Sequence, residues 1–223
     1  MRRGKTIAVA GNIGSGKSSL VDFLSQAYDI KPFYEPNDEN PYLPDFYADM
    51  RRWAFHSQLY FLSNKFRLHM ALDQHDGVVV LDRTIFEDAE IFATALRQMR
   101  KFTGRDWETY WNFYRIILDA IQPPNLMIYL RCPMRTIRRR IRLRGRAMEQ
   151  DIPLSYLKRL ERLYETWIKR YTMGEVLILD SGKLDFINDM VDRLDVMEKI
   201  ESLLPKTLER RDRKSTRLNS SHL

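Results

Sequence analysis

Short apolar runs alternate with longer amphipathic segments along most of the chain. Five runs have the length and apolar content of buried strands, and they are Lys5–Ala10, Lys31–Glu35, Gly77–Asp82, Asn125–Leu130 and Glu175–Leu179. Segments with helical periodicity follow them, at Lys17–Tyr28, Arg51–Gln74, Glu87–Lys101, Asp106–Ile121, Pro133–Leu143, Leu154–Tyr171 and Phe186–Leu204. Apolar strands separated by helices predict an α/β fold, with a five-stranded parallel β-sheet flanked by helices on both faces.

Length and composition predict one globular domain, which we assign to residues 1–204. Residues 205–223 are basic and lack periodicity, so we expect a disordered tail, and its KSTRLNSSHL end resembles translated cloning sequence. No apolar run is long enough for a membrane span, so no membrane association is expected. The single Cys132 cannot form an internal disulfide, which favours a cytoplasmic location.

The net charge of +7 is unevenly distributed. The tail carries six Lys/Arg and two Asp/Glu, and residues 131–146 carry eight arginines and no acid. Because the rest of the chain is net acidic, a broad nucleic-acid-binding surface is not expected. The pattern indicates a local anion site instead.

The clearest motif follows the first predicted strand, where residues 11–18 read GNIGSGKS and match G-x-x-x-x-G-K-[ST]. Glycines let the backbone curl around a phosphate, and the helix that begins near Lys17 adds its positive dipole end. We expect Lys17 to reach the β- and γ-phosphates of ATP and the Ser18 hydroxyl to bind Mg²⁺. The predicted ATP-binding residues in this loop are Gly11, Asn12, Ile13, Gly14, Ser15, Gly16, Lys17, Ser18 and Ser19.

The phosphate loop alone is shared by GTPases, ATPases and small-molecule kinases. A GTPase would carry N-K-x-D to read guanine, but Asn64-Lys65 is followed here by Phe66-Arg67. A glycine-rich turn that happens to contain a lysine is the structural alternative. The position between a strand and a helix favours the phosphate loop.

Three further motifs fall at predicted strand ends, and they are Glu35-Pro36, Asp82-Arg83-Thr84 and Arg142-x-Arg144-Gly145-Arg146. Ligands of parallel α/β sheets bind at these ends. In this order, together with the phosphate loop, the motifs resemble those of the deoxyribonucleoside kinase family over roughly residues 5–204. The resemblance implies a P-loop kinase fold with an Arg-rich lid, a homodimer, and transfer of the γ-phosphate of a nucleoside triphosphate to the 5′-hydroxyl of a deoxynucleoside.

Two strand ends carry candidate catalytic groups. A carboxylate near a phosphate site can accept the proton of a hydroxyl nucleophile, and the resemblance implies that Glu35 is this general base. Asp82 ends a buried strand that faces the loop, where a carboxylate can hold Mg²⁺. The resemblance implies that Arg83 contacts the 5′-hydroxyl and the catalytic carboxylate. A turn-capping Glu35 and a surface Asp82–Arg83 pair are the alternatives.

An arginine-rich lid is expected at about residues 138–150. Arg142 and Arg146 lie four residues apart, as do Arg140 and Arg144, so guanidiniums share helix faces. Fixed guanidiniums stabilise the charge that spreads over the γ-phosphate oxygens during transfer. The resemblance implies that Arg144 and Arg146 are catalytic and that Arg142 also binds ATP, with a solvated basic face as the alternative.

The resemblance also implies residues that bind the nucleoside. Tyr47 and Glu149 hydrogen-bond the sugar 3′-hydroxyl, and this clamp crowds the 2′ position, which favours deoxyribose. The Gln58 amide reads the base edge and Phe92 stacks on the base. Phe55 and Phe61 could line the same pocket, although aromatic residues at helical spacing are more often core residues.

The choice of base depends on two positions. Asp88 matches the acid of purine- and cytosine-accepting members, and Lys65 falls where purine-using members place an arginine. A Lys65–Asp88 pair can orient the acid but lacks the guanidinium fork. We expect a deoxypurine, with deoxyadenosine slightly ahead of deoxyguanosine and deoxycytidine as a side activity; an ordinary salt bridge is the alternative for Asp88.

Two other functions compete on the same fold. A nucleoside monophosphate kinase of the thymidylate type would continue E-P-G-G, whereas Glu35-Pro36 is followed by N-D-E, a poor neighbour for a phosphorylated substrate. A non-catalytic nucleotide-binding protein would be expected to have lost Lys17, Glu35 or the lid arginines, and all are present. The sequence therefore favours a deoxynucleoside kinase.

Overall fold

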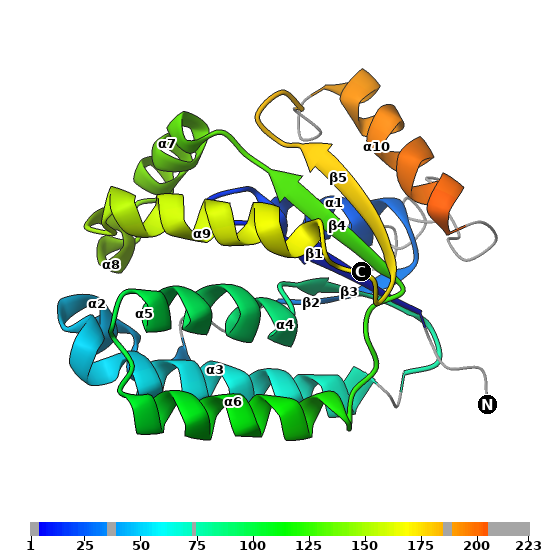
Figure 1. The fold of residues 1–223 in the computed structure, drawn as a ribbon. Helices are drawn as coiled ribbons and strands as arrows, with labels where there is room; N and C mark the ends of the chain where they lie inside the picture. The colour runs from blue at the N-terminus through cyan, green and yellow to red at the C-terminus, as the bar shows by residue number, and fades with distance from the viewer. Residues whose placement is uncertain (1–4, 35–38, 73–74, 185–188, 205–223) are drawn as a thin grey trace, which may run out of the picture.

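In the computed structural model, which describes residues 5–34, 39–72, 75–184 and 189–204, a parallel sheet runs through the centre of the molecule (Figure 1). Its strands are β1 (Lys5–Ala10), β2 (Ile30–Phe33), β3 (Val78–Asp82), β4 (Leu126–Arg131) and β5 (Glu175–Asp180). Their order is β2-β3-β1-β4-β5, and every neighbouring pair is parallel. The predicted fold class, a five-stranded parallel sheet flanked by helices, is confirmed.

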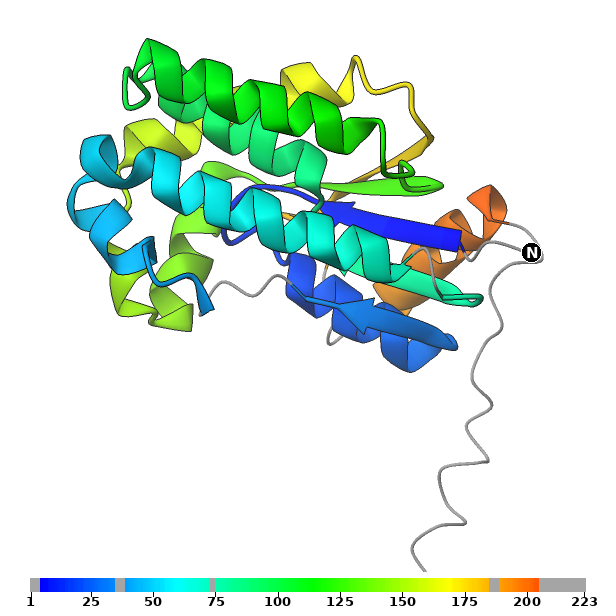
Figure 2. The same ribbon diagram turned by 90° about the horizontal axis from the view of Figure 1, so that it is seen from below.

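Helices connect the strands and cover both faces of the sheet. They are α1 (Lys17–Ala27), α2 (Leu43–Ala48), α3 (Met50–Leu72), α4 (Ile85–Glu87), the π-helix η2 (Asp88–Ala93), α5 (Thr94–Gln98), α6 (Gly104–Leu118), α7 (Met134–Arg144), α8 (Ala147–Gln150), α9 (Leu154–Ile168) and α10 (Met190–Leu203). Figure 2 shows α6 running beside α3. Among the helices of the described ranges, none combines the length and apolar character that crossing a membrane requires.

Side chains alternate across the strands and so build two cores. Ile7 and Val9 pack into the core on the α1 and α10 face. Ala8 and Ala10 face the opposite core, to which α3, η2, α6 and α9 contribute. The sheet is therefore the middle of three layers, and its strands can be apolar on both sides.

Several element predictions need correction. The helix predicted over residues 87–101 begins at Ile85 and passes through a π-helical turn, in which the Thr94 hydroxyl donates to the Ala89 carbonyl at 2.9 Å. The second strand begins at Ile30, one residue earlier than predicted. Helices α2 and α8 were not expected, because segments of 6 and 4 residues are too short to show periodicity.

The carboxyl ends of all five strands lie at one edge of the sheet because the strands are parallel. The short helices α2 and α8 and the arginine-rich α7 gather beyond this edge (Figure 1). The phosphate loop leaves β1, which lies between β3 and β4. The predicted motifs that follow these strands are thereby brought to one place.

Candidate active site

The loop after β1 is already curled into an anion-binding shape. Gly14 and Gly16 have φ values of 75° and 100°, in the left-handed region that favours glycine. A Cβ at Gly14 would lie 3.0 Å from Ile141 Cγ1 of α7, so a larger residue would also collide with that helix. The predicted phosphate loop is therefore present, with α7 packed closely over it.

Lys17 lies inside this loop. Its Nζ donates to the Gly11 carbonyl at 3.1 Å and to the Asn12 carbonyl at 3.2 Å. The Asn12 side chain accepts from the Ile13 N–H at 2.8 Å and donates to the Leu157 carbonyl of α9 at 3.0 Å. The loop is thus fixed from inside by its lysine and from outside by α9.

Helix α7 holds the loop through Arg140, a residue that the sequence analysis did not select. Its Nη1 donates to the Ser15 carbonyl at 2.7 Å and its Nη2 to the Ser181 carbonyl at 3.0 Å. The Ser181 hydroxyl donates to the same Ser15 carbonyl at 3.0 Å. Arg142, selected in its place, is exposed and lines neither cavity described below, so its role stays a prediction.

The corner after β3 lies beside the loop. Arg83 has a φ of 66° and is only 8% exposed. Its guanidinium lies 4.3 Å from the centroid of the Phe92 ring, and its Nε lies 3.9 Å from Glu87 Oε1. Asp82 accepts a hydrogen bond from the Ser18 hydroxyl of the loop. The predicted Arg83, Asp82 and Ser18 therefore meet in space.

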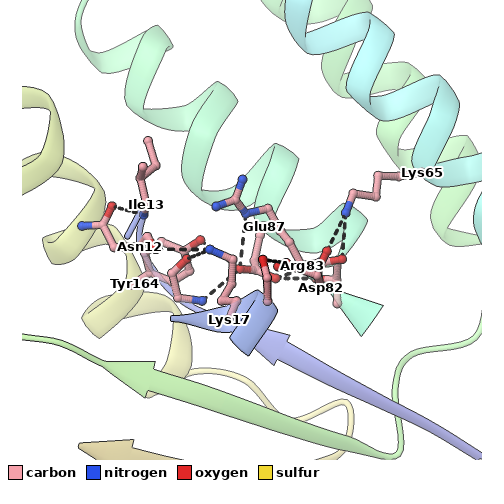
Figure 3. A network of polar contacts seen from close by, with 11 residues as sticks. Asn12, Ile13, Lys17, Lys65, Asp82, Arg83, Glu87 and Tyr164 are labelled. Carbon is pink, nitrogen blue, oxygen red and sulfur yellow. Dashed lines mark hydrogen bonds and ion pairs between the residues drawn. The ribbon is translucent and has the colours of Figure 1, made fainter. Parts of the chain in front are cut away.

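Glu87 joins the loop to this corner, and the sequence analysis missed it. Its fully buried carboxylate accepts from the Gly11 N–H at 3.2 Å, the Tyr164 hydroxyl at 2.8 Å and the Thr84 N–H at 2.8 Å (Figure 3). Burial raises the pKa of the Glu87 carboxyl, and the nearby Arg83 guanidinium opposes this rise. The sequence signal that could have pointed to Glu87 is the capping box that it forms with Thr84.

A cavity of about 470 Å³ opens at the carboxyl ends of the strands. The predicted site residues that line it are Ile13, Gly14, Lys17, Ser18, Tyr47, Gln58, Asp82, Arg83, Asp88, Phe92, Arg144, Arg146 and Glu149. Phe61, considered for this pocket, also lines it, whereas Phe55 does not. Unselected residues complete the lining, and they are Tyr34, Leu43, Phe46 and Tyr156. Apolar rings with a few converging polar groups suit the binding of a small molecule.

Three residues that line this cavity offer it polar and aromatic groups. Gln58 on α3 is 4% exposed, and its Oε1 has no hydrogen-bond partner among the described residues. Asp88 and Phe92 of η2 line the same cavity. A buried acceptor that faces a cavity without a protein partner indicates a ligand donor there.

The lid arginines are held by Glu149. This carboxylate forms ion pairs with Arg144 Nη2 and, at 3.5 Å, with Arg146 Nη1, and it is 8% exposed. Tyr47 lines the same cavity. The structure therefore brings the predicted sugar-binding pair and the predicted lid arginines together, while their contacts with substrate stay predictions.

A second cavity of about 340 Å³ lies against the phosphate loop. It is lined by Gly14, Gly16, Lys17, Ser18, Ser19, Arg140 and Arg144. Four of these, namely Gly14, Lys17, Ser18 and Arg144, also line the larger cavity. The two cavities therefore meet at the lysine, the hydroxyl and one lid arginine.

The oxygens of Ser18 and Asp82 fit Mg²⁺, which prefers hard oxygen ligands. Asp82 Oδ1 is buried and has no hydrogen-bond partner among the described residues, so an acceptor is left beside the Ser18 hydroxyl. In the described part of the chain, no group of three or more His, Cys, Asp or Glu side chains could hold a metal ion. Two protein oxygens, completed by water and phosphate, are typical of Mg²⁺ at a nucleotide.

Two predicted residues need separate mention. Glu35 lies outside the described residues, although Tyr34, immediately before it, lines the larger cavity. Lys65 does not line that cavity. It is 2% exposed, and its Nζ donates to the carbonyls of Asp82 and Arg83 at 3.1 and 2.8 Å.

The fold and the site define a class of protein, the P-loop phosphotransferases, with a pocket for a small acceptor beside the phosphate loop. A profile of the family described as deoxynucleoside kinase matches residues 7–205, and the chain belongs to this family. The predicted family and the predicted phosphotransferase class are thereby confirmed.

Similar proteins agree with this assignment. The chain is 37% identical over 204 residues to the deoxyguanosine kinase of Lactobacillus acidophilus, covering 87% of this chain and 88% of that one. It is 34% identical over 200 residues to the deoxyadenosine/deoxycytidine kinase of Bacillus subtilis, covering 89% and 92%. The structure of deoxyadenosine kinase from M. mycoides with bound dATP matches with a TM-score of 0.78 at 28% identity, covering 88% and 99%.

Proposed function

We propose that this chain transfers the γ-phosphoryl group of ATP to the 5′-hydroxyl of a deoxyribonucleoside, with a deoxypurine preferred. The observation that carries the proposal is the meeting of the two cavities at Lys17, Ser18 and Arg144. A donor in the smaller cavity and an acceptor in the larger one would meet at these residues. Adjacent sites for donor and acceptor are what phosphoryl transfer needs.

ATP occupies the smaller cavity in this proposal. The N–H groups of the loop and the start of α1 bind its phosphates, and Lys17 and Arg144 stabilise the charge that develops on the γ-phosphoryl oxygens. Ser18 and Asp82 hold Mg²⁺, which, when bound, neutralises the β- and γ-phosphate oxygens. Arg140 supports the loop through the Ser15 carbonyl.

The deoxynucleoside occupies the larger cavity. Phe92 stacks on the base, while Gln58 and Asp88 read its polar edge. Tyr47 and Glu149 hold the sugar 3′-hydroxyl. The burial of Gln58 and Asp88, at 4% and 3% exposure, supports a base-reading role, because buried polar groups discriminate strongly between ligands.

Glu35 accepts the proton of the 5′-hydroxyl and Arg83 orients that hydroxyl. The lining of the cavity by Arg83 and by Tyr34, the residue before Glu35, supports this assignment. A hydroxyl at neutral pH needs such a base to become a nucleophile. Deoxyadenosine and deoxyguanosine are the proposed acceptors, in keeping with the names of the L. acidophilus and B. subtilis relatives.

The test is release of ADP from ATP and Mg²⁺ with deoxyadenosine, deoxyguanosine, deoxycytidine, thymidine and thymidine monophosphate as acceptors. Glu35→Gln runs in parallel, and Glu39→Gln, at an exposed nearby position, is the matched control. We expect turnover on a deoxypurine that Glu35→Gln lowers by about a thousandfold and Glu39→Gln leaves intact. Turnover on thymidine monophosphate alone would assign a monophosphate kinase, and ATP binding without turnover would assign a non-catalytic protein.

A homodimer, a cytoplasmic location, and the division into a domain of residues 1–204 and a basic tail of residues 205–223 also stay proposals. The family resemblance supports the dimer, and the single cysteine supports a reducing compartment. Light scattering should give twice the chain mass of 26.7 kDa. A mass of one chain would overturn the dimer.

A further inference from the structure

Arg83 has a backbone conformation that its side chain does not favour. Its φ of 66° lies in the left-handed region, where a residue with a Cβ is strained and stays only if its surroundings impose the conformation. This conformation turns the chain at the end of β3 and leaves the guanidinium over the Phe92 ring, within the lining of the larger cavity. Something in the fold must therefore hold the corner.

Hydrogen bonds fix the two peptide planes on either side of Arg83. In the first plane, the Arg83 N–H donates to the Val9 carbonyl of β1 at 3.0 Å. In the second plane, the Thr84 N–H donates to the Glu87 carboxylate at 2.8 Å. The carbonyls of both planes, those of Asp82 and Arg83, accept from Lys65. A single ammonium thus bridges the two planes whose relative rotation sets φ and ψ of Arg83.

Lys65 lies where it can hold this corner. It projects from α3 toward the end of β3 (Figure 3). Its side chain is among the largest fully buried ones, at 2% exposure, and it is absent from the lining of the larger cavity. An ammonium carries three donors and no acceptor, so it can satisfy two carbonyls at once. A buried charge is retained only where such partners compensate its desolvation.

We propose that Lys65 is a positioning residue that imposes the left-handed conformation of Arg83 and so aims the Arg83 guanidinium at the reacting hydroxyl. The inference rests on the proposed function, in which Arg83 orients the 5′-hydroxyl. It is an alternative to the interpretation of Lys65 as a partner that helps Asp88 to read the base. The two interpretations differ in what the loss of Lys65 does to the choice of acceptor.

The first experiment compares Lys65→Met and Lys65→Gln with the wild type. Arg67→Met, which removes an exposed cation from the same helix, is the matched control. We expect Lys65→Met to lower kcat about a hundredfold, because misplacement of a catalytic group by about 1 Å has an effect of this size. Lys65→Gln, whose amide still donates, should recover part of the loss. The ratios of kcat/KM among deoxyadenosine, deoxyguanosine and deoxycytidine should not change.

A double-mutant cycle separates positioning from a general loss of stability. If Lys65 acts through Arg83, then Lys65→Met lowers kcat in the wild type but not further in the Arg83→Ala background. Equal losses in both backgrounds would overturn the proposal, and so would a change in base preference. If Lys65→Met does not fold, Lys65→Gln takes its place in the cycle.

Amide hydrogen exchange tests the proposal without any turnover. Loss of the Lys65 ammonium should speed exchange in the segment from Arg83 to Glu87 while leaving the segment from Gly11 to Ser18 protected. If the wild type phosphorylates no deoxynucleoside, only the proposed function is overturned. Faster exchange from Arg83 to Glu87 in the Lys65 variants would still support the role of Lys65. Unchanged exchange at the corner would overturn that role even in an active enzyme.

Discussion

The guanidinium of Arg83 lies 4.3 Å from the centroid of the Phe92 ring, and both residues are 8% exposed. A guanidinium over an aromatic face is attracted by the ring quadrupole, more strongly where water is excluded. The residue proposed at the 5′-hydroxyl is thereby packed on the residue proposed to stack on the base. In the proposed function Phe92 thus has two tasks, one toward the substrate and one toward Arg83.

Phe92→Leu should therefore affect both kinetic constants. We expect the acceptor KM to rise because stacking is lost, and kcat to fall about tenfold because Arg83 loses its aromatic contact, a contribution of up to about 2 kcal/mol. Steady-state kinetics with varied deoxyadenosine gives both constants. Phe55→Leu is the control, since Phe55 packs on Phe102 and does not line the cavity. A rise in KM with unchanged kcat would contradict the second task.

Glu149 connects the predicted lid arginines to the proposed sugar site, because it pairs with Arg144 and Arg146 and lines the larger cavity. Glu149→Gln should lower kcat about tenfold, since the neutral amide holds both guanidiniums less firmly. Preference for a deoxynucleoside over its 2′,3′-dideoxy analogue should also shrink, because a hydrogen bond to the 3′-hydroxyl is weakened. Competition between the two acceptors measures this preference. Asp151→Asn, at an exposed position close by, should change neither quantity.

Arg140 hydrogen-bonds the Ser15 and Ser181 carbonyls and lines the smaller cavity, the proposed donor site. Arg140→Met should raise the KM for ATP about tenfold, because the loop loses a charge-assisted hydrogen bond, and should leave the acceptor KM unchanged. Arg139→Met removes an exposed arginine from the same helix and is the matched control. Equal effects of the two variants on the ATP KM would show that only overall positive charge matters.

Much of this site could be predicted because its signals are local and its topology is simple. The loop from Gly11 to Ser18 is one continuous motif, and Asp82 and Arg83 directly end a strand. Since parallel strands end at one edge, motifs far apart in sequence had to meet there. Tyr47 lies on α2 and not at a strand end, so only the family resemblance pointed to it.

The contacts that sequence reasoning missed depend on distant partners. The Glu87 carboxylate binds Gly11 and Tyr164, which lie 76 and 77 residues away along the chain. A spacing of four among arginines does not tell which helix face meets the phosphate loop. That choice follows from the burial of Ile137 and Ile141, which turns Arg140 toward Ser15.

His69 should make the stability of the fold depend on pH. Burial, and secondly the Lys65 charge, lower the pKa of this imidazole to about 4. Because the folded pKa is below the unfolded value, the contribution of His69 to stability is full above about pH 6.5 and is lost as the pH falls toward 4.

Between pH 7.5 and 5 the wild type should lose about 2 kcal/mol more unfolding free energy than His69→Leu. Urea unfolding at both pH values measures the difference, with His56→Leu, at an exposed position of the same helix, as control. Equal losses in the wild type and His69→Leu would mean that His69 is protonated without cost in the folded protein.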